Sequence, residues 1–450
     1  MADLPEDLAP IPFKRPEPTA AFFGGGRPAE HPYAVMYRGE FETPWDGTAV
    51  AVRAHARALA LTGIPVLLRS YTGSVTDEHG VTRPAYSTDP DPGVAREVGA
   101  LELTTAEHYL PIIHHMVVAN SDHLKRTVMP QGATGGTFEE QAELRRRVYE
   151  STVVYSVWER TSVDPAIVKT LSRVAECWVP CHANAAMLAA SGVPREKIFV
   201  VPHPYDPADP ILKLRRRNPD ASWKKFYSIG RWEPRKGYVE LVEAFLGAFT
   251  PKDNAILTIK YTGGKWPSYE TPEALIARLE TSAHVRERGW TPEKIRERVK
   301  LIEGRFPRAA ILELHYRNNI YVSSSHGEAW NLPAFEAALA GNNVCYVPSG
   351  GVEDYLGNGH SVVAPSGFEH VPRSYGWEPL AAWMSYEVRS LASALARSHP
   401  PTARHDRPDS IDLKRFTLEE VGGVMRARAT YVASTSARAA LYYAERSAKR

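Results

Sequence analysis

A chain of 450 residues is long enough for two domains of about 200 residues each. Its hydrophobic share of 43%, charged share of 24% and formal charge of +2 are typical of an ordinary globular protein, and they give no support for a nucleic-acid or membrane partner. No apolar run approaches the roughly 20 residues that a helix needs to span a bilayer, so we expect no integral membrane segment.

The amino terminus and the cysteines indicate the compartment. Residues Met1 to Pro18 are acidic and rich in proline, which is unlike a secretory signal peptide. Three cysteines in 450 residues argue against a disulfide framework, so we expect a reducing, cytoplasmic location. Cys177, Cys181 and the adjacent His182 have a spacing that a metal site could use. No fourth ligand lies nearby, so core packing is the preferred interpretation.

The first 30 residues are predicted to form a mobile or draped arm, because they contain six prolines and a run of three glycines. That run, Gly24 to Gly26, follows no strand and opens no helix. It therefore lacks the setting of a phosphate-binding loop.

A first β-α-β unit follows the arm. Its parts are a strand at Tyr33 to Tyr37, a helix at Thr48 to Leu61 and a strand at Ile64 to Leu68. The loop at the carboxyl end of the first strand contains Asp46 and Gly47. Open α/β sheets bind ligands at this edge, so the loop is a candidate binding segment.

Two later apolar runs, Ile112 to Val118 and Val153 to Glu159, are predicted to be buried strands of the same domain. Each carries a candidate functional residue, His115 in the first and Glu159 in the second. The alternative for His115 is a hydrogen-bonded core histidine, and for Glu159 a functional and a purely structural role both stay open.

A proline-rich segment is predicted to form a stiff, extended connection from the first domain to the second. Its prolines are Pro202, Pro204, Pro207, Pro210 and Pro219. The basic run Lys213 to Arg217 lies on this crossing, where a solvated face is the simplest interpretation.

The second domain opens with two cations in a strand-loop-helix setting. Arg231 and Lys236 lie between a strand that begins at Phe226 and a helix at Val239 to Phe249, and a strand at Ala255 to Tyr261 completes the unit. Arginine can bind two oxygens in a fork, whereas lysine acts as a point charge. The pair therefore suits a phosphate-bearing ligand.

The segment Ser323 to Glu336 is a second strand-loop-helix element. The apolar run Ile320 to Val322 precedes it, and Pro333 suits the first turn of the helix that follows. Glu328 falls in the loop and Glu336 about one turn inside the helix. Because the first amides of a helix have no intrahelical acceptor, an anion fits there with a carboxylate on either side.

The chain is predicted to continue with a strand at Val344 to Val347 and a glycine-containing turn at Pro348 to Tyr355. Residues 366 to 377 are expected to form an insertion-like loop. Helices are then expected from about Pro379 to Ser398 and from Thr417 to Tyr443.

These segments together resemble the retaining GT-B glycosyltransferases of family 4. Glu328 and Glu336 match the family's E-x7-E motif, although the usual loop E-G-F-G-L-P is here E-A-W-N-L-P. Arg231 and Lys236 match its G-R-x-x-x-x-K-G element, and Val200 to Asp206 resembles its segment "vvPnGvD".

Two further segments resemble motifs of the same family. The turn at Pro348 to Tyr355 resembles the family's "dvGGxxE" turn, and Asp46-Gly47 supplies one glycine where the family usually has a Gly-Gly pair. The resemblance is good for residues 150 to 430 and poor for residues 33 to 150.

The resemblance implies an α/β fold of the GT-B type, in which two Rossmann-like β/α/β domains face each other across a cleft. The expected parts are an arm at 1–30, an acceptor domain at 31–210, a nucleotide-sugar-binding domain at 211–425 and a terminal helix at 426–450 that returns to the first domain.

The implied activity is transfer of a sugar, with retention at the anomeric carbon, from a nucleotide sugar such as UDP-glucose or GDP-mannose, without a metal or other cofactor. The implied catalytic residues are Glu328, Arg231, Lys236, His115 and Glu159. The donor diphosphate would be bound by Arg231, Lys236, Gly47, Trp330, Asn331 and Leu332. Glu336 would bind ribose hydroxyls, and Glu328 the hydroxyls of the donor sugar.

Other functions stay open at this point. Ala329 and Asn331 replace the two usual glycines of the loop, which leaves room for a GT-B-fold binding protein without catalysis. The basic clusters Arg145 to Arg147 and Lys213 to Arg217 could track a nucleic-acid backbone, as in a transferase that acts on DNA. Hydrolysis by a pair of carboxylates is disfavoured, because the cation pair implies an activated leaving group.

Overall fold

The structure, a computed structural model, describes residues 34–41, 46–71, 75–76, 82–83, 98–102, 109–118, 120–129, 137–214, 222–263, 266–267, 269–357, 359–375, 381–401 and 413–447. The expected arm at 1–30 and the end of the basic run, 215–217, lie outside the described residues. Two compact units contain the described residues. We call them the N-unit, from Pro16–Trp158, Ser162–Pro207 and Leu413–Arg450, and the C-unit, from Glu159–Thr161 and Ala208–Asp412.

The N-unit is built on a six-stranded parallel sheet with strand order β2-β1-β5-β6-β7-β8. Its strands are β1 (Ala34–Arg38), β2 (Val66–Arg69), β5 (Tyr109–Met116), β6 (Thr152–Ser156), β7 (Glu176–Val179) and β8 (Ile198–Val200). A separate antiparallel pair joins β3 (Val75–Thr76) to β4 (Thr82–Arg83). All five residues of β6 are buried, as expected for a central parallel strand that is covered on both faces.

Helices flank this sheet. They are α1 (Gly47–Leu61), α3 (Ser121–Val128), α4 (Phe138–Glu150), α5 (Pro165–Leu171), α6 (His182–Ala190) and α16 (Leu418–Ser447), with short 3-10 turns η3 (Arg195–Lys197) and η6 (Leu413–Phe416). Asp46 begins α1 as its N-cap, because its carboxylate accepts a hydrogen bond from the amide of Thr48 at 2.8 Å. Helix α16 packs against α1, and a Cβ added at Gly422 would lie 2.2 Å from the carbonyl oxygen of Ala58. This approach requires glycine.

The C-unit repeats the plan with a six-stranded sheet in the order β11-β10-β9-β12-β13-β14. All neighbouring strands are parallel: β9 (Lys224–Trp232), β10 (Ala255–Gly263), β11 (Val299–Glu303), β12 (Ile320–Ser323), β13 (Asn343–Tyr346) and β14 (Ser361–Val362). Its order reverses on either side of β9, so β9 and β12 lie at the sheet's topological switch point. Ligands of open α/β sheets bind at the carboxyl ends of such strands.

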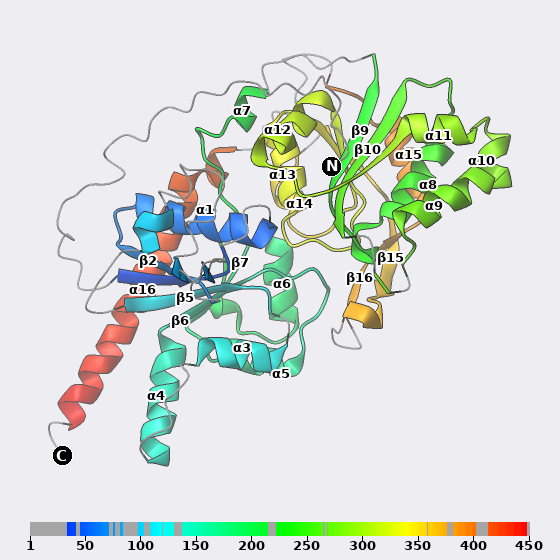
Figure 1. Cartoon of the computed structure of the whole chain (residues 1–450). Helices are drawn as coiled ribbons and strands as arrows, with labels where there is room; N and C mark the ends of the chain where they lie inside the picture. Colours follow the sequence, from blue (N-terminus) through cyan, green and yellow to red (C-terminus); the bar gives the residue numbers. More distant parts are fainter. Residues whose placement is uncertain are drawn as a thin grey trace. The chain divides into compact units, whose positions relative to one another are not determined.

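Two layers of helices cover this second sheet (Figure 1). They come from α7 (Ile211–Leu214), α8 (Tyr238–Ala248), α9 (Pro272–Thr281), α10 (Ala283–Glu287), α11 (Pro292–Arg298), α12 (Arg308–Arg317), α13 (Leu332–Leu339), α14 (Val352–Tyr355) and α15 (Val388–Arg397), with turns η4 (Pro234–Lys236) and η5 (Arg373–Tyr375). Side chains of β9 alternate between the layers. Phe226 packs on Phe245 of α8 with ring centroids 6.1 Å apart, whereas Tyr227 hydrogen-bonds His315 of α12 at 2.7 Å.

The sequence-based prediction was wrong between residues 365 and 387. Strand β15 (Pro365–His370) occupies the start of the expected loop. Strand β16 (Ala382–Tyr386) pairs antiparallel with β15 and occupies part of the expected helix, so that helix α15 begins only at Val388. Trp383 and Tyr386 are buried, and the Trp383 indole donates to Glu369 at 2.7 Å. Aromatic residues favour a half-buried pleated surface, so their tertiary contacts override the helical pattern.

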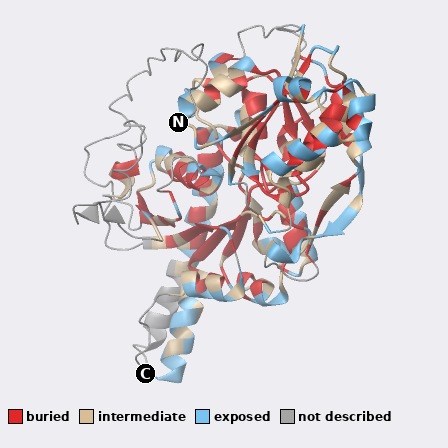
Figure 2. Cartoon of the chain, turned by 45° about the vertical axis from the view of Figure 1, so that its right-hand side comes forward, coloured by how far each residue is buried: buried red, intermediate tan, exposed pale blue. Residues whose placement is uncertain are grey.

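Burial follows these layers in each unit, with buried strands between helices that expose their outer faces (Figure 2). In the N-unit core, Leu418, Val421 and Met425 of α16 join side chains from α1 and the sheet. Within the described residues, none of the helices has the length and apolar character that crossing a membrane would require.

Three buried histidines meet in the N-unit core. The rings of His55 and His115 are 5.4 Å apart, and those of His55 and His203 are 5.1 Å apart. Burial lowers the pKa of His55 to about 4, although the carbonyls of Ala51 and Pro202 favour its protonated form. The pKa values of His115 and His203 are held well below the usual 6.5 by burial and then by the neighbouring imidazoles.

We expect this cluster to make the protein acid-sensitive. Each folded-state pKa is lower than the unfolded value, so the unfolded chain takes up protons first as the pH falls below about 6.5. Each histidine should remove on the order of 1 kcal/mol of unfolding free energy by about pH 5.5. Urea unfolding at a series of pH values measures the slope.

A matched pair of variants tests the assignment. His55→Gln should make the slope shallower, whereas His370→Gln, which changes an exposed histidine of β15, should leave it unchanged. Equal slopes for both variants and the wild type would contradict the prediction.

Candidate functional site

Two loops at the carboxyl edge of the C-unit sheet interlock. The first follows β9 and contains Arg235 and Lys236 in η4, and the second follows β12. The Ser324 hydroxyl donates to the carbonyl of Lys236 at 2.7 Å, and the amide of His326 donates to the carbonyl of Arg235 at 2.8 Å. These bonds fix the η4 cations against the loop that carries Glu328.

Glu328 lies at the centre of a buried ion cluster. The Lys236 ammonium donates to its carboxylate, although the two residues are 92 positions apart in the chain. The Arg235 guanidinium lies 3.3 Å from the same carboxylate, 3.1 Å from Glu159 and 2.7 Å from Glu233. The site therefore gathers three carboxylates and two cations.

The two central carboxylates differ in how easily they ionise. Burial alone would raise the pKa of Glu328, but Lys236 and Arg235 hold it below its usual range. The pKa of Glu159 is raised, because burial and the repulsion of Glu328 outweigh the attraction of Arg235. Of these two carboxylates, Glu328 is thus the one that ionises more readily, and as an anion it accepts hydrogen bonds.

The β15–β16 hairpin hydrogen-bonds the backbone of the loop that carries Glu328. Tyr386 donates to the carbonyl of Ser324 at 2.6 Å, and the backbone of Met384 donates to the carbonyl of His326 at 2.8 Å. The His326 ring stacks on Trp383 with a centroid distance of 5.5 Å. A segment predicted as loop and helix therefore helps to hold the loop in position.

Left-handed backbone geometry supports the Glu328 loop at Gly350, which follows β13, and at Asn331, which follows β12. Gly350 has φ +68°, and a Cβ there would lie 1.6 Å from the Glu328 carbonyl oxygen, so only glycine fits. Asn331 has φ 64°, and its side chain accepts from the amide of Ala334 at 3.3 Å as the N-cap of α13. Asparagine tolerates this geometry better than most residues, which explains how it replaces the glycine of the related loop.

Glu336 belongs to a different network from Glu328. It is ion-paired with Arg308 at the start of α12, and Arg308 also contacts Asp209 at 3.0 Å. His315 lies 3.4 Å from the other oxygen of Glu336. Although burial opposes ionisation, Arg308 and His315 lower the pKa of Glu336 to about 2, so it is a carboxylate at any physiological pH.

Arg231 lies near the end of β9 and is exposed to solvent. By strand alternation it shares the sheet face of Tyr227, the face that α12 covers. Within the described residues it makes no hydrogen bond or ion pair, in contrast to Lys236 and Arg235. Arg231 is thus a cation at the carboxyl edge of the sheet with no ion-pair partner among the described residues.

The other residues named from the sequence lie in both units. Trp330, Asn331 and Leu332 form the entry to α13 in the C-unit, where Trp330 is buried. Gly47 opens α1 in the N-unit. His115, also in the N-unit, shares a hydrogen bond of 2.8 Å with the Tyr37 hydroxyl. The structure brings Lys236, Glu328 and Glu159 together, and it places Glu336 in a separate network.

Sequence reasoning missed Arg235 and Arg308. Arg235 falls among the unspecified positions of the G-R-x-x-x-x-K-G pattern, and only its burial at 6% exposure separates it from a surface arginine. Arg308 is the first residue of α12 and belongs to none of the motifs. Nothing in its local sequence indicates that it pairs with Glu336.

Two arginines of the basic cluster at Arg145 to Arg147 are ion-paired within α4, and Arg145 hydrogen-bonds Gln141 at 3.0 Å. Arg146 pairs with Glu143 at 2.8 Å and with Glu150 at 2.7 Å, and Arg147 pairs with Glu143 at 2.8 Å. This arrangement is a solvated helix face with internal ion pairs, and it does not favour a nucleic-acid surface.

No metal-binding arrangement is found within the part of the chain that the structure describes, where no three or more histidine, cysteine or acidic side chains are grouped suitably. Cys177 and Cys181 are buried free thiols. Burial raises the pKa of the Cys177 thiol to about 12, as expected for a core cysteine.

Two parallel six-stranded sheets, each covered by helices, define a two-domain Rossmann-like α/β protein of the GT-B type, which confirms the predicted fold class. The chain is similar in fold to a solved α,α-trehalose 6-phosphate synthase from Burkholderia multivorans, with a TM-score of 0.52 and 14% identity over 90% of this chain and 99% of that one.

Two other solved structures resemble it less closely. Anabaena Alr3699/HepE in complex with UDP and glucose has a TM-score of 0.49 and 14% identity, over 87% of this chain and 98% of that chain. A glycosyltransferase from Rickettsia africae has a TM-score of 0.48 and 13% identity, over 89% and 98% of the two chains. No protein-family model and no curated protein matches the sequence.

Proposed function

We propose that this protein is a retaining glycosyltransferase that moves a sugar from a nucleoside-diphosphate sugar to an acceptor hydroxyl. One observation carries the proposal: Lys236 and Glu328, 92 positions apart in sequence, form an ion pair at the carboxyl edge of the C-unit sheet. A cation and an ionised carboxylate at a switch point suit a ligand that contains both phosphate and hydroxyl groups. The fold similarity to a trehalose 6-phosphate synthase is compatible with this activity.

The donor diphosphate would be bound by Arg231, Lys236 and the backbone amides near Trp330 to Leu332, at the start of α13. These groups stabilise the negative charge that develops on the leaving diphosphate. Because Arg231 has no partner within the described residues, it can bind phosphate without breaking an ion pair. We propose that these fixed cations act without a metal cofactor.

The two glutamates would bind hydroxyl groups. Glu336 is ionised, with a pKa of about 2, so it can accept hydrogen bonds from ribose hydroxyls. Glu328 would accept hydrogen bonds from the donor sugar while Lys236 turns toward the phosphate. His115 and Glu159 remain candidates for contacts near the reacting sugar, and Gly47 for close approach to the diphosphate.

In the proposed step, the acceptor hydroxyl oxygen forms a bond to the anomeric carbon as the carbon–oxygen bond to the β-phosphate breaks. The electron pair leaves with the nucleoside diphosphate, and the hydroxyl proton passes to the leaving phosphate on the same face. We also infer a cytoplasmic location, supported by the three free cysteines.

Nucleotide sugars should stabilise the protein against heat. A ligand at about 100 times its dissociation constant adds about 2.7 kcal/mol to the unfolding free energy. Thermal unfolding with UDP-glucose, GDP-mannose and other nucleotide sugars measures this effect and identifies the donor.

NAD is the matched control, because it carries a diphosphate but no transferable hexose. Stabilisation by NAD alone, or by none of the nucleotide sugars, would contradict the proposal. Slow release of free sugar from the stabilising donor would then separate an enzyme from a binding protein that lacks catalysis.

A further inference from the structure

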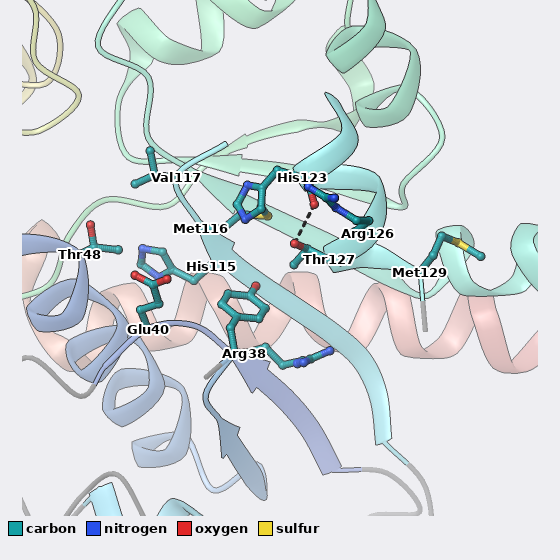
Figure 3. Close-up of a pocket in the computed structure, with 11 residues that line it drawn as sticks. Arg38, Glu40, Thr48, His115, Met116, Val117, His123, Arg126, Thr127 and Met129 are labelled. Carbon is teal, nitrogen blue, oxygen red and sulfur yellow. Dashed lines mark hydrogen bonds between the residues drawn. The ribbon is translucent and has the colours of Figure 1, made fainter. Parts of the chain in front are cut away.

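A large cavity lies in the N-unit at the carboxyl ends of β1 and β5. Its volume is about 780 Å³, which is sufficient for a small organic molecule. In Figure 3, Arg38 and His115 lie between Thr48 at one end of the lining and Met129 at the other. Strands β1 and β5 are parallel neighbours, with Arg38 opposite His114, so both deliver their last side chains to this edge.

The lining carries more positive than negative charge. Arg38 and Arg126 both face the cavity, and Glu40 is the one carboxylate among its described lining residues. Arg38 stacks on the ring of Tyr71 at 5.2 Å from its centroid. Neither arginine forms an ion pair within the described part of the chain, and Arg126 is exposed on α3. Two arginines without carboxylate partners suit an anionic group, which a guanidinium can bind through two oxygens.

Hydroxyl-binding groups lie in the same lining. His115 is 1% exposed, and its Nε2 atom has no hydrogen-bond partner among the described residues, while its Nδ1 atom shares a hydrogen bond with the Tyr37 hydroxyl. A buried polar atom without a partner is costly unless a ligand or water satisfies it. Thr48 and Glu40 add a hydroxyl and a carboxylate to the lining. These are the groups that recognise sugar hydroxyls.

We infer that this cavity binds the acceptor, and that the acceptor is a small hydroxylated molecule carrying a phosphate or carboxylate group. Arg38 and Arg126 would bind the anionic group, and His115 and Thr48 would bind hydroxyls. The assignment of this ligand as acceptor rests on the proposed function, whereas its binding to the N-unit does not.

Binding of three probes without any donor tests the inference by calorimetry on the full chain. Glucose 6-phosphate and glucuronate should bind at least about 10-fold more tightly than glucose, since a hydrogen bond to a charged group contributes substantially to binding. The tighter of the two anions identifies the class of anionic group. Equal binding of all three probes, or binding of none, would overturn the inference.

Variants on one helix provide the matched control. Arg126→Gln should weaken binding of the preferred anion about 10-fold or more and leave glucose binding unchanged. Lys125→Gln removes the same charge from the adjacent position, which does not line the cavity, and should leave both unchanged. An equal loss in the two variants would indicate general surface electrostatics and contradict the site.

A variant of the half-buried Arg38 provides a second, independent test in case the Arg126 variant does not fold. Arg38→Gln should lose anion selectivity as Arg126→Gln does, with an unchanged thermal midpoint as the check of folding. If an anionic sugar binds but no nucleotide sugar stabilises the protein, the proposed function fails and the cavity stands. If nucleotide sugars bind and the anions do not, the acceptor inference alone fails.

Discussion

Replacing Lys236 with alanine is expected to lower kcat/KM for sugar transfer about 30- to 1000-fold while the protein stays folded. The loss corresponds to about 2–4 kcal/mol of transition-state stabilisation, the range measured when a group that stabilises developing charge is removed. Lys236 is placed for this role because its ammonium lies on Glu328 at the sheet edge and its side chain keeps 13% exposure. The Lys236 ammonium can therefore reach a ligand from its resting ion pair.

Folding should survive this change, because Arg235 still lies 3.3 Å from Glu328 and keeps that carboxylate compensated. Lys294→Ala is the control, since Lys294 is an exposed lysine of the same unit that pairs with the exposed Glu297 at 2.7 Å. Steady-state kinetics with the donor found by thermal screening gives the comparison. Near-normal turnover of the Lys236 variant would remove the residue from the mechanism.

Arg231 offers a second check on the same step. If the diphosphate is bound as proposed, Arg231→Ala should reduce transfer without reducing stability, because the exposed Arg231 side chain makes no hydrogen bond or ion pair with a described residue. Comparing the two variants therefore separates the loss of Lys236, which is ion-paired with Glu328, from the loss of Arg231, which has no ion pair among the described residues.

The alternation of apolar runs and helical patterns predicted the β-α-β units of both domains, and the family resemblance implied the GT-B fold. Buried parallel strands such as β6 and β12 are continuous apolar runs, and short runs of this kind between amphipathic helices favour a parallel sheet. The prediction failed at β15 and β16, where the choice between helix and strand depends on partners distant in sequence. Trp383 and Tyr386 are held by Glu369 and Ser324, and no local pattern encodes those contacts.

The site was predictable only as far as short motifs extend. Motif spacing indicated Lys236 and Glu328 as site residues. It could not show that the neighbouring Arg235 would be buried in contact with three carboxylates. It also could not distinguish Glu328, which pairs with the η4 cations, from Glu336, which pairs with Arg308. Side-chain pairing across a sheet edge arises from tertiary structure, so sequence spacing alone does not determine it.

Replacing Arg235 with methionine is expected to destabilise the protein by about 3–5 kcal/mol, the usual cost of removing one partner from a buried ion pair. Among the described residues, Arg235 alone forms ion pairs with Glu159, Glu233 and Glu328 together. Without it, Lys236 alone would compensate the cluster. The remaining buried carboxylates would repel one another or take up protons. Urea unfolding at neutral pH measures the loss.

A double-mutant cycle separates lost charge compensation from lost packing. Glu233 is 4% exposed and lies 2.7 Å from Arg235, so Glu233→Gln removes one of the uncompensated charges. The double variant Arg235→Met with Glu233→Gln should therefore be more stable than Arg235→Met alone, by about 1 kcal/mol or more, the coupling typical of residues in direct contact. If both Arg235 variants lose the same stability, packing of the arginine side chain outweighs its charge. If neither loses stability, the ion cluster does not stabilise the loops that carry Lys236 and Glu328, and another structural basis for their positions is required.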